Sequence, residues 1–343
     1  MERTGTPAVA VPVAGPPAVA AVRGDGGDGD GSRFAGRGAV GGPVRPGAAR
    51  GSAGRPVLGR VGIWAGDSDG YPAAGLRAAA AAVEESGYGA LWFAETAGRE
   101  AMAQAAILLS ATRRITVAAG MADIYARDAV TTAAARRTLA EAFPGRFLLG
   151  LWESHPSLAE DVRGHRYRPA RAAMRSYLDA LDAAPFGPSA GTGPPGHLLA
   201  ALDLGMLGLA AERTWGANVL GMPVEHTRRA RAALGPDPLL AVTQLCVLGP
   251  DRSRTAGPAR ATAAAALPNR RALLEELGHR DVDALGERLV DAIVAHGDAG
   301  AIARRVHEHL DAGADHVSLH LVTARPDVPP LRQWERLAGQ LPL

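Results

Sequence analysis

The chain has 343 residues, of which 47% are hydrophobic, so it can bury one barrel-sized core or two medium ones. A formal net charge of +2 gives no strong field for holding nucleic acid, and no apolar run reaches the roughly 18 residues of a membrane span. The single cysteine, Cys246, excludes an internal disulfide and a cysteine-cluster metal site, and the lack of lysine excludes Schiff-base catalysis. We therefore expect a cytoplasmic protein whose partner is a small molecule, with no nucleic-acid, membrane or metal partner.

Residues 1–57 differ in composition from the rest of the chain. They contain 14 glycines and 7 prolines, with Phe34 as their only aromatic residue. Such a segment cannot bury enough apolar surface to offset its chain entropy. We predict a disordered extension over residues 1–57 and a single domain over residues 58–343.

In the domain, apolar segments typical of strands alternate with alanine-rich segments typical of helices. The predicted strands are Val61–Trp64, Ala90–Ala94, Ile115–Gly120, Phe147–Leu151, His197–Leu202, Asn218–Leu220, Leu239–Leu248 and His316–Val322. The predicted helices are Pro72–Ser86, Arg99–Ser110, Val130–Ala142, Arg168–Ala184, Met206–Arg213, Glu225–Leu234, Asp283–Ala295 and Ala299–Ala312. Eight strands in alternation with helices favour a closed α/β fold, the (β/α)8 or TIM barrel.

The segment Asp251–Arg280 does not fit a minimal strand–helix repeat. It adds an alanine-rich helix after the seventh strand, followed by the sequence Leu267–Arg271. An insertion at this point would lie over the mouth of a barrel, where substrates enter. It is either a lid, with Asn269 as a candidate substrate contact, or a packed surface helix.

Candidate site residues are those that follow the strands, because the active site of such a barrel lies at their carboxyl ends. Glu95 follows the second strand and is either a proton donor or a carboxylate at a helix N-terminus. His155 follows the fourth strand and is either a catalytic or cofactor contact or a surface histidine. Trp64 and Trp152 either stack on a planar ring or fill space, and Tyr125 is a further candidate substrate contact.

Several phrases of the chain resemble the bacterial-luciferase-like superfamily. They are Leu58–Trp64, Gly87–Trp92, Phe147–Leu151 and Asp311–Val317, with Ala94-Glu95, Ala126–Asp128 and Ser154-His155 adding to the likeness. The branch most similar to this chain is that of the actinobacterial oxidoreductases that use the deazaflavin coenzyme F420. The resemblance covers nearly all of residues 58–322.

This resemblance implies a planar cofactor ring deep in the barrel mouth. Relatives support that ring with a non-prolyl cis peptide after the third strand, a place that Gly120 and Met121 occupy here, followed by Ala122. Residues after the fourth strand line the ring, here Trp152, Glu153, Ser154 and His155. The cofactor phosphate is held by backbone N–H groups after the fifth strand, here at Gly205 and Met206. Relatives are also often homodimers.

The chain departs from its relatives at two of these places. Asp203 stands where relatives have glycine, and it would bring negative charge close to the phosphate unless an arginine intervenes. Glu95-Thr96 replaces an Asp-His pair that some members carry, so that catalytic histidine is absent.

Three functions remain open from the sequence. The first is an oxidoreductase of specialised metabolism in which a reduced deazaflavin delivers hydride to a small organic compound. Glu95 or His155 would be its proton donor. The second is an FMN-dependent monooxygenase. The third is a barrel without cofactor that catalyses a step such as cyclisation or only binds a ligand.

Overall fold

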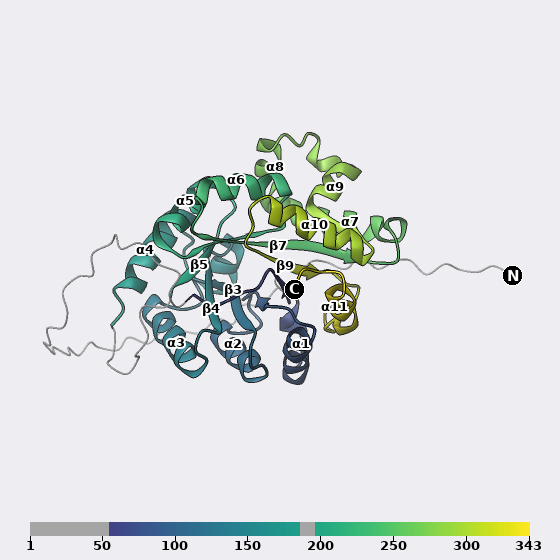
Figure 1. The fold of residues 1–343 in the computed structure, drawn as a ribbon. Coiled ribbons are helices and arrows are strands. Elements are labelled where there is room, and N and C mark those ends of the chain that lie inside the picture. Colours follow the sequence, from purple (N-terminus) through teal and green to yellow (C-terminus); the bar gives the residue numbers. More distant parts are fainter. Residues whose placement is uncertain (1–54, 186–195) are drawn as a thin grey trace, which may run out of the picture.

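The computed structural model describes residues 55–185 and 196–343 (Figure 1). Most of the predicted disordered extension, residues 1–54, lies outside the described residues. Within the described parts, no helix is both long and apolar enough to cross a membrane. The same parts contain no group of His, Cys, Asp and Glu side chains that could hold a metal ion.

In the described residues, nine parallel strands form the sheet at the centre of the molecule. They are β1 (Val61–Trp64), β2 (Ala90–Phe93), β3 (Thr116–Asp123), β4 (Phe147–Trp152), β5 (His197–Ala200), β6 (Gly216–Leu220), β7 (Leu239–Leu248), β8 (Val294–Gly297) and β9 (His316–Leu321). Eight of them close a barrel, because β1 to β7 follow one another, β7 pairs with β9, and β9 pairs back with β1. The predicted TIM barrel is therefore confirmed, and the carboxyl ends of its strands meet at one mouth.

Helices surround this barrel, as Figure 1 shows for α1 to α6. The helices are α1 (Ala73–Glu85), α2 (Ala101–Ser110), α3 (Ala129–Ala142), α4 (Ala170–Asp182), α5 (Leu204–Arg213), α6 (Val224–Leu234), α7 (Arg252–Ala266), α8 (Arg271–Glu276), α9 (Glu287–Ile293), α10 (Ala299–Asp311) and α11 (Leu331–Ala338). Short turns of helix are η1 (Ser68–Gly70), η2 (Leu158–Val162), η3 (Leu267–Asn269) and η4 (Val282–Ala284). The insertion after β7 comprises α7, η3, α8 and η4, which confirms the predicted extra helix.

Two elements differ from the sequence predictions. The predicted helix Asp283–Ala295 is wrong at both ends, because α9 begins at Glu287 and the chain turns into β8 at Val294. β8 lies outside the closed barrel and pairs with the far half of β7, at Leu245–Leu248. The sequence analysis also missed α11, whose Trp334 is buried and whose backbone carbonyl accepts a hydrogen bond from Tyr88 Oη at 2.7 Å.

The interior of the barrel is filled by side chains below the mouth. Trp64 and Trp92 stack with ring centroids 6.4 Å apart and planes 15° apart. A Cβ atom at Gly120 would overlap Trp92 and lie 3.3 Å from Trp64 Cζ3, so the two indoles require glycine at this point of β3. Trp64 is buried, with 4% of its surface exposed, and therefore forms the floor of the mouth.

Candidate active site at the barrel mouth

Strand β3 changes register just below the mouth. Its pairing with β4 shifts between Ala119 and Ala122, so Gly120 and Met121 form a bulge that redirects the strand. The resemblance implied a cis peptide at this place, but the described residues contain none. That expectation is wrong here: the bulge redirects β3 with trans peptides alone. Ala122 packs into the layer between strands and helices, so only its backbone can meet a ligand in the mouth.

Glu95, a predicted site residue, is held in a buried ion pair. Arg127 Nη1 donates to Glu95 Oε2 at 2.9 Å, and Arg127 Nη2 donates to the other carboxylate oxygen. The N–H groups of Ala101 and Asp123 donate to the same carboxylate at 3.1 and 2.8 Å. Burial lowers the pKa of Arg127, but the bonds to Glu95 outweigh it and the pKa is raised. Glu95 thus ties the end of β2 to the segment after β3.

Asp128, the neighbour of Arg127, has a separate structural task. Its side chain accepts from Thr131 N at 2.9 Å and caps the N-terminus of α3. Arg127 itself pairs with Glu95 and Glu100.

A second buried carboxylate fixes the backbone after β4. Asp123 is fully buried and accepts from Ser154 Oγ at 2.9 Å and Arg163 Nε at 3.0 Å. Ser154 is held in the left-handed region, at φ 67°, where residues with a side chain are uncommon. The sequence analysis placed Ser154 at the ring but missed Arg163, which lies 40 positions from Asp123.

Trp152 and Glu153 both have a buried polar atom without a partner. Neither Trp152 Nε1 nor Glu153 Oε2 makes a hydrogen bond with the described residues. Burial raises the pKa of the Glu153 carboxyl, and the negative charge of Asp203 raises it further. An unsatisfied buried polar group costs about 1–3 kcal/mol, so a hydrogen bond from a ligand would stabilise either atom.

His155 lies between β4 and the insertion. The edge of its ring meets Trp152, with centroids 5.1 Å apart and planes at 83°. Asn269 Nδ2 approaches His155 Nε2 at 3.4 Å, so the insertion reaches the mouth as a lid would. Burial lowers the pKa of His155, as does the positive charge of Arg270, and the imidazole is neutral at pH 7.

Arg270, which follows Asn269, holds the insertion against the barrel. Its Nε and Nη2 donate to the carbonyl of Leu220, at the end of β6, at 3.2 and 3.0 Å. Burial lowers its pKa to about 10, so it stays positively charged at neutral pH. The sequence analysis noted the segment that contains Arg270 but gave this residue no role.

The start of α5 combines negative and positive charge. Asp203 is the N-cap of this helix and accepts from Met206 N at 3.0 Å. The backbone N–H of Met206 is therefore already bonded, and its side chain is buried. The backbone N–H groups of Leu204 and Gly205 belong to the first helical turn, which leaves such groups without a partner inside the helix. A Cβ atom at Gly205 would lie 2.7 Å from Arg171 Nη1, so an arginine does lie beside Asp203.

Known proteins resemble this chain in sequence and in fold. The sequence profile of the luciferase-like monooxygenase family matches residues 57–316, about three quarters of the chain. The chain belongs to this family. A Mycobacterium tuberculosis (strain H37Rv) protein that bears the name of a coenzyme F420-dependent oxidoreductase is 29% identical to it over 173 residues, 48% of this chain and 47% of that protein. The match thus spans about half the length of this curated relative.

Solved structures of very low sequence identity share the fold. The coenzyme F420-dependent tetrahydromethanopterin reductase of Methanopyrus kandleri is 16% identical, with a TM-score of 0.61 over 83% of this chain and 98% of its own. The oxygenating constituent of 3,6-diketocamphane monooxygenase from Pseudomonas putida, in complex with FMN, is 15% identical, with a TM-score of 0.63 over 83% and 99%. At these identities the likeness supports the fold, the luciferase-like barrel, and does not extend to the cofactor or the substrate.

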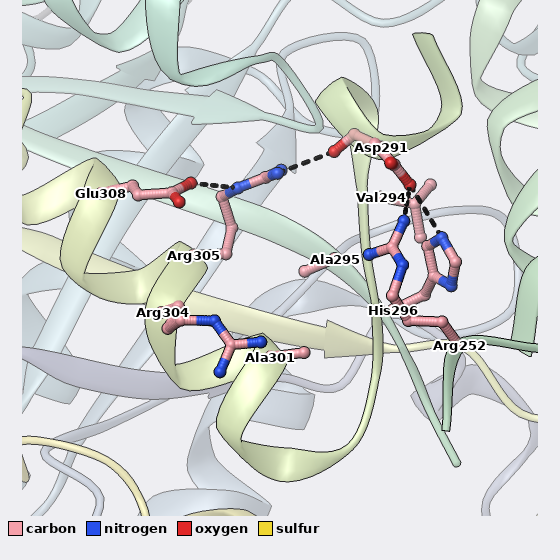
Figure 2. Close-up of a pocket in the computed structure, with 9 residues that line it drawn as sticks. All are labelled: Arg252, Asp291, Val294, Ala295, His296, Ala301, Arg304, Arg305 and Glu308. Carbon is pink, nitrogen blue, oxygen red and sulfur yellow. Dashed lines mark hydrogen bonds and ion pairs between the residues drawn. The ribbon is translucent and has the colours of Figure 1, made fainter. Parts of the chain in front are cut away.

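This luciferase-like barrel also has a polar crevice between α9, β8, α10 and the start of α7 (Figure 2). It measures about 120 Å³ and is lined by Arg252, Asp291, Val294, Ala295, His296, Ala301, Arg304, Arg305 and Glu308. Asp291 accepts from Arg252 at 2.5 Å and from His296 at 2.9 Å, so much of its lining is already ion-paired. None of the predicted site residues lies there, and the mouth remains the candidate active site.

Proposed function

We propose that this protein is an oxidoreductase that binds reduced coenzyme F420 at the barrel mouth and reduces a small organic substrate by hydride transfer. One observation carries the proposal: two buried polar atoms on consecutive residues, Trp152 Nε1 and Glu153 Oε2, have no hydrogen-bond partner among the described residues. Membership of the luciferase-like family and the F420-related name of the M. tuberculosis relative support the choice of cofactor.

The residues of the mouth fit a flat, phosphorylated cofactor. Trp64 supplies an aromatic floor, and Gly120 and Met121 form the bulge at the side of the mouth. Leu204 and Gly205 would give N–H groups to the phosphate, as helix N-termini do. Arg171, which lies beside Gly205, would offset the negative charge of Asp203 there.

We propose Glu153 as the proton donor. Bound reduced F420 would supply a hydride to an electrophilic carbon of the substrate. Glu153 would then give its proton to the substrate oxygen or nitrogen, since its raised pKa favours the protonated form. His155 would orient the substrate beside Trp152. Glu95 would act through position only, because all its bonds serve to fix Arg127 and the local backbone.

The second candidate is an FMN-dependent monooxygenase, because the diketocamphane monooxygenase structure of the same fold contains FMN. A barrel without cofactor is the third. Fluorescence titration of the full chain with F420 and, separately, with FMN distinguishes all three. Saturable micromolar binding of F420 alone is expected. Binding of FMN alone would support the monooxygenase, and a folded protein that binds neither would refute both redox functions.

We also propose that the protein acts as a cytoplasmic homodimer in specialised metabolism. The alanine-rich helices of the first half of the barrel, such as α1, would permit close approach of two copies. Analytical ultracentrifugation of the full chain tests the dimer, and a single species of 35.2 kDa would contradict it.

A further inference from the structure

A cluster of aromatic side chains lies on the rim of the mouth between β3 and β4. The Tyr125 ring, just after β3, stacks on Tyr167 with centroids 5.7 Å apart and planes 26° apart. His165 packs on the same Tyr125 ring at 5.9 Å. We call these three side chains the aromatic rim. Both tyrosines are half-buried and His165 is exposed, so the cluster is open to solvent on one side.

This cluster stands out because aromatic residues are scarce in the chain. Only 4% of the residues are Phe, Trp or Tyr, and five of them are tyrosines. Tyr71 and Tyr88 are buried in the core, and Tyr177 ties α4 to α3 through Thr132 at 2.5 Å. The other two tyrosines are the ones stacked at the mouth. Tyr125 packs in part against the hydrophobic core, so Tyr167 is the one of the two whose position core packing does not explain.

Trp152 and Glu153, which carry the unpartnered polar atoms, lie at the end of β4, next to the segment after β3 that contains Tyr125. The N–H of Ile124 donates to the Trp152 carbonyl at 3.1 Å, which joins the segment of Tyr125 to the end of β4. Tyr167 and Glu153 both belong to the segment between β4 and α4, and the negative charge of Glu153 adds to burial in raising the pKa of Tyr167. The aromatic rim and the two unpartnered atoms, Trp152 Nε1 and Glu153 Oε2, thus lie on the same two neighbouring segments of the mouth.

We propose that the substrate is a planar aromatic ketone whose ring packs on the aromatic rim and whose oxygen bonds to Trp152 Nε1 and Glu153. This inference rests on the proposed function. In the reduction, a C–H bond forms at the carbonyl carbon and the C=O π bond breaks. The oxygen takes the proton of Glu153, so the ketone becomes an alcohol, and the two electrons come with the hydride of the reduced deazaflavin.

A purely structural role of the tyrosine pair is the competing explanation. Tyr125 Oη accepts from Arg168 N at 3.0 Å, so Tyr125 also holds the segment that contains Tyr167. Tyr167 is therefore the residue to change. Stacking of one aromatic pair contributes about 0.5–1.5 kcal/mol, which corresponds to a two- to tenfold change in a dissociation constant.

The test measures binding of two ketones to the full chain by calorimetry. 2-Acetylnaphthalene is planar and aromatic, whereas 1-acetyladamantane has the same acetyl group and carbon count on a round aliphatic body. We expect the wild type to prefer the planar ketone. We expect Tyr167→Leu to weaken that binding two- to tenfold, and Tyr167→Phe to retain it.

Thermal unfolding and F420 titration of each variant serve as controls. Unchanged unfolding and F420 affinity in Tyr167→Leu, with weaker binding of the planar ketone, would support the proposal. Equal binding of the two ketones, or equal affinities in Tyr167→Leu and wild type, would overturn it. Failure of the proposed function is seen separately, as absence of F420 binding by the wild type.

Discussion

Two buried histidines make the stability of this barrel sensitive to acid. His309, on α10, bonds to Gln244 Oε1 at 2.7 Å and Thr227 Oγ1 at 2.8 Å, which ties α10 and α6 to β7. Burial is the main cause that lowers its pKa from 6.5 to about 3. His316, inside the barrel, accepts from Trp92 Nε1 at 3.0 Å, and burial lowers its pKa to about 4.

The sign and size of the effect follow from these values. A lowered pKa means that the folded chain binds fewer protons than the unfolded chain between about pH 6.5 and pH 4, so stability falls as pH falls through this window. Each pKa unit corresponds to about 1.36 kcal/mol. From neutral pH to pH 5, we expect each histidine to cost about 2 kcal/mol and the pair about 4 kcal/mol of unfolding free energy.

Guanidinium unfolding at a series of pH values between 7.5 and 5 measures this loss. We expect His309→Gln to be less stable than wild type at pH 7.5 but to lose about 2 kcal/mol less on acidification, because one of the two titrations is removed. The matched control is His307→Gln on the same helix, where the side chain is exposed and the acid slope should stay that of the wild type. A His309→Gln slope equal to the wild-type slope would refute the reasoning.

Three other changes test the mouth. Glu153→Gln should keep F420 affinity but lower kcat. Wild-type activity should fall as pH rises through the pKa of Glu153, and a pH–rate profile should show that the variant lacks this fall. Gly120→Ala should destabilise the fold by about 1–3 kcal/mol because its Cβ would overlap Trp92, and an unchanged midpoint of denaturation would contradict this. Arg127→Met should cost about 3–5 kcal/mol by leaving the buried Glu95 carboxylate uncompensated, and the double variant with Glu95→Leu should recover part of that loss in the same unfolding assay.

The strands of the barrel were predictable because periodicity and composition decide them locally. Leu239–Leu248 is apolar except for Thr243 and Gln244, and β7 has those same bounds. β8 was not predictable, since Val294–Gly297 continues a helical pattern and becomes a strand only because β7 extends beyond β6 and offers a free edge. For α11 a signal existed: Pro329-Pro330 precedes apolar residues at helical spacing, Leu331, Trp334 and Leu337.

The site was predictable only as a set of positions at strand ends. The rule that catalytic residues follow barrel strands selected Glu95, Trp152 and Glu153 alike. It could not say which carboxylate is already bonded, because the partner of Glu95 lies 32 positions away at Arg127. Nor could the sequence place Arg163 on Asp123, a contact across 40 positions that only the closed barrel brings together.

The number of partners is what separates the two carboxylates that follow β2 and β4. Glu95 receives two backbone N–H groups and an arginine, so both of its oxygens are already bonded and neither is left for a substrate. Glu153 is buried with one oxygen unbonded, and burial favours its neutral form. A general acid must carry a proton that it can release to a ligand within reach. We therefore propose the proton-donor role for Glu153, one oxygen of which the fold leaves unbonded, and not for Glu95, whose oxygens are both bonded.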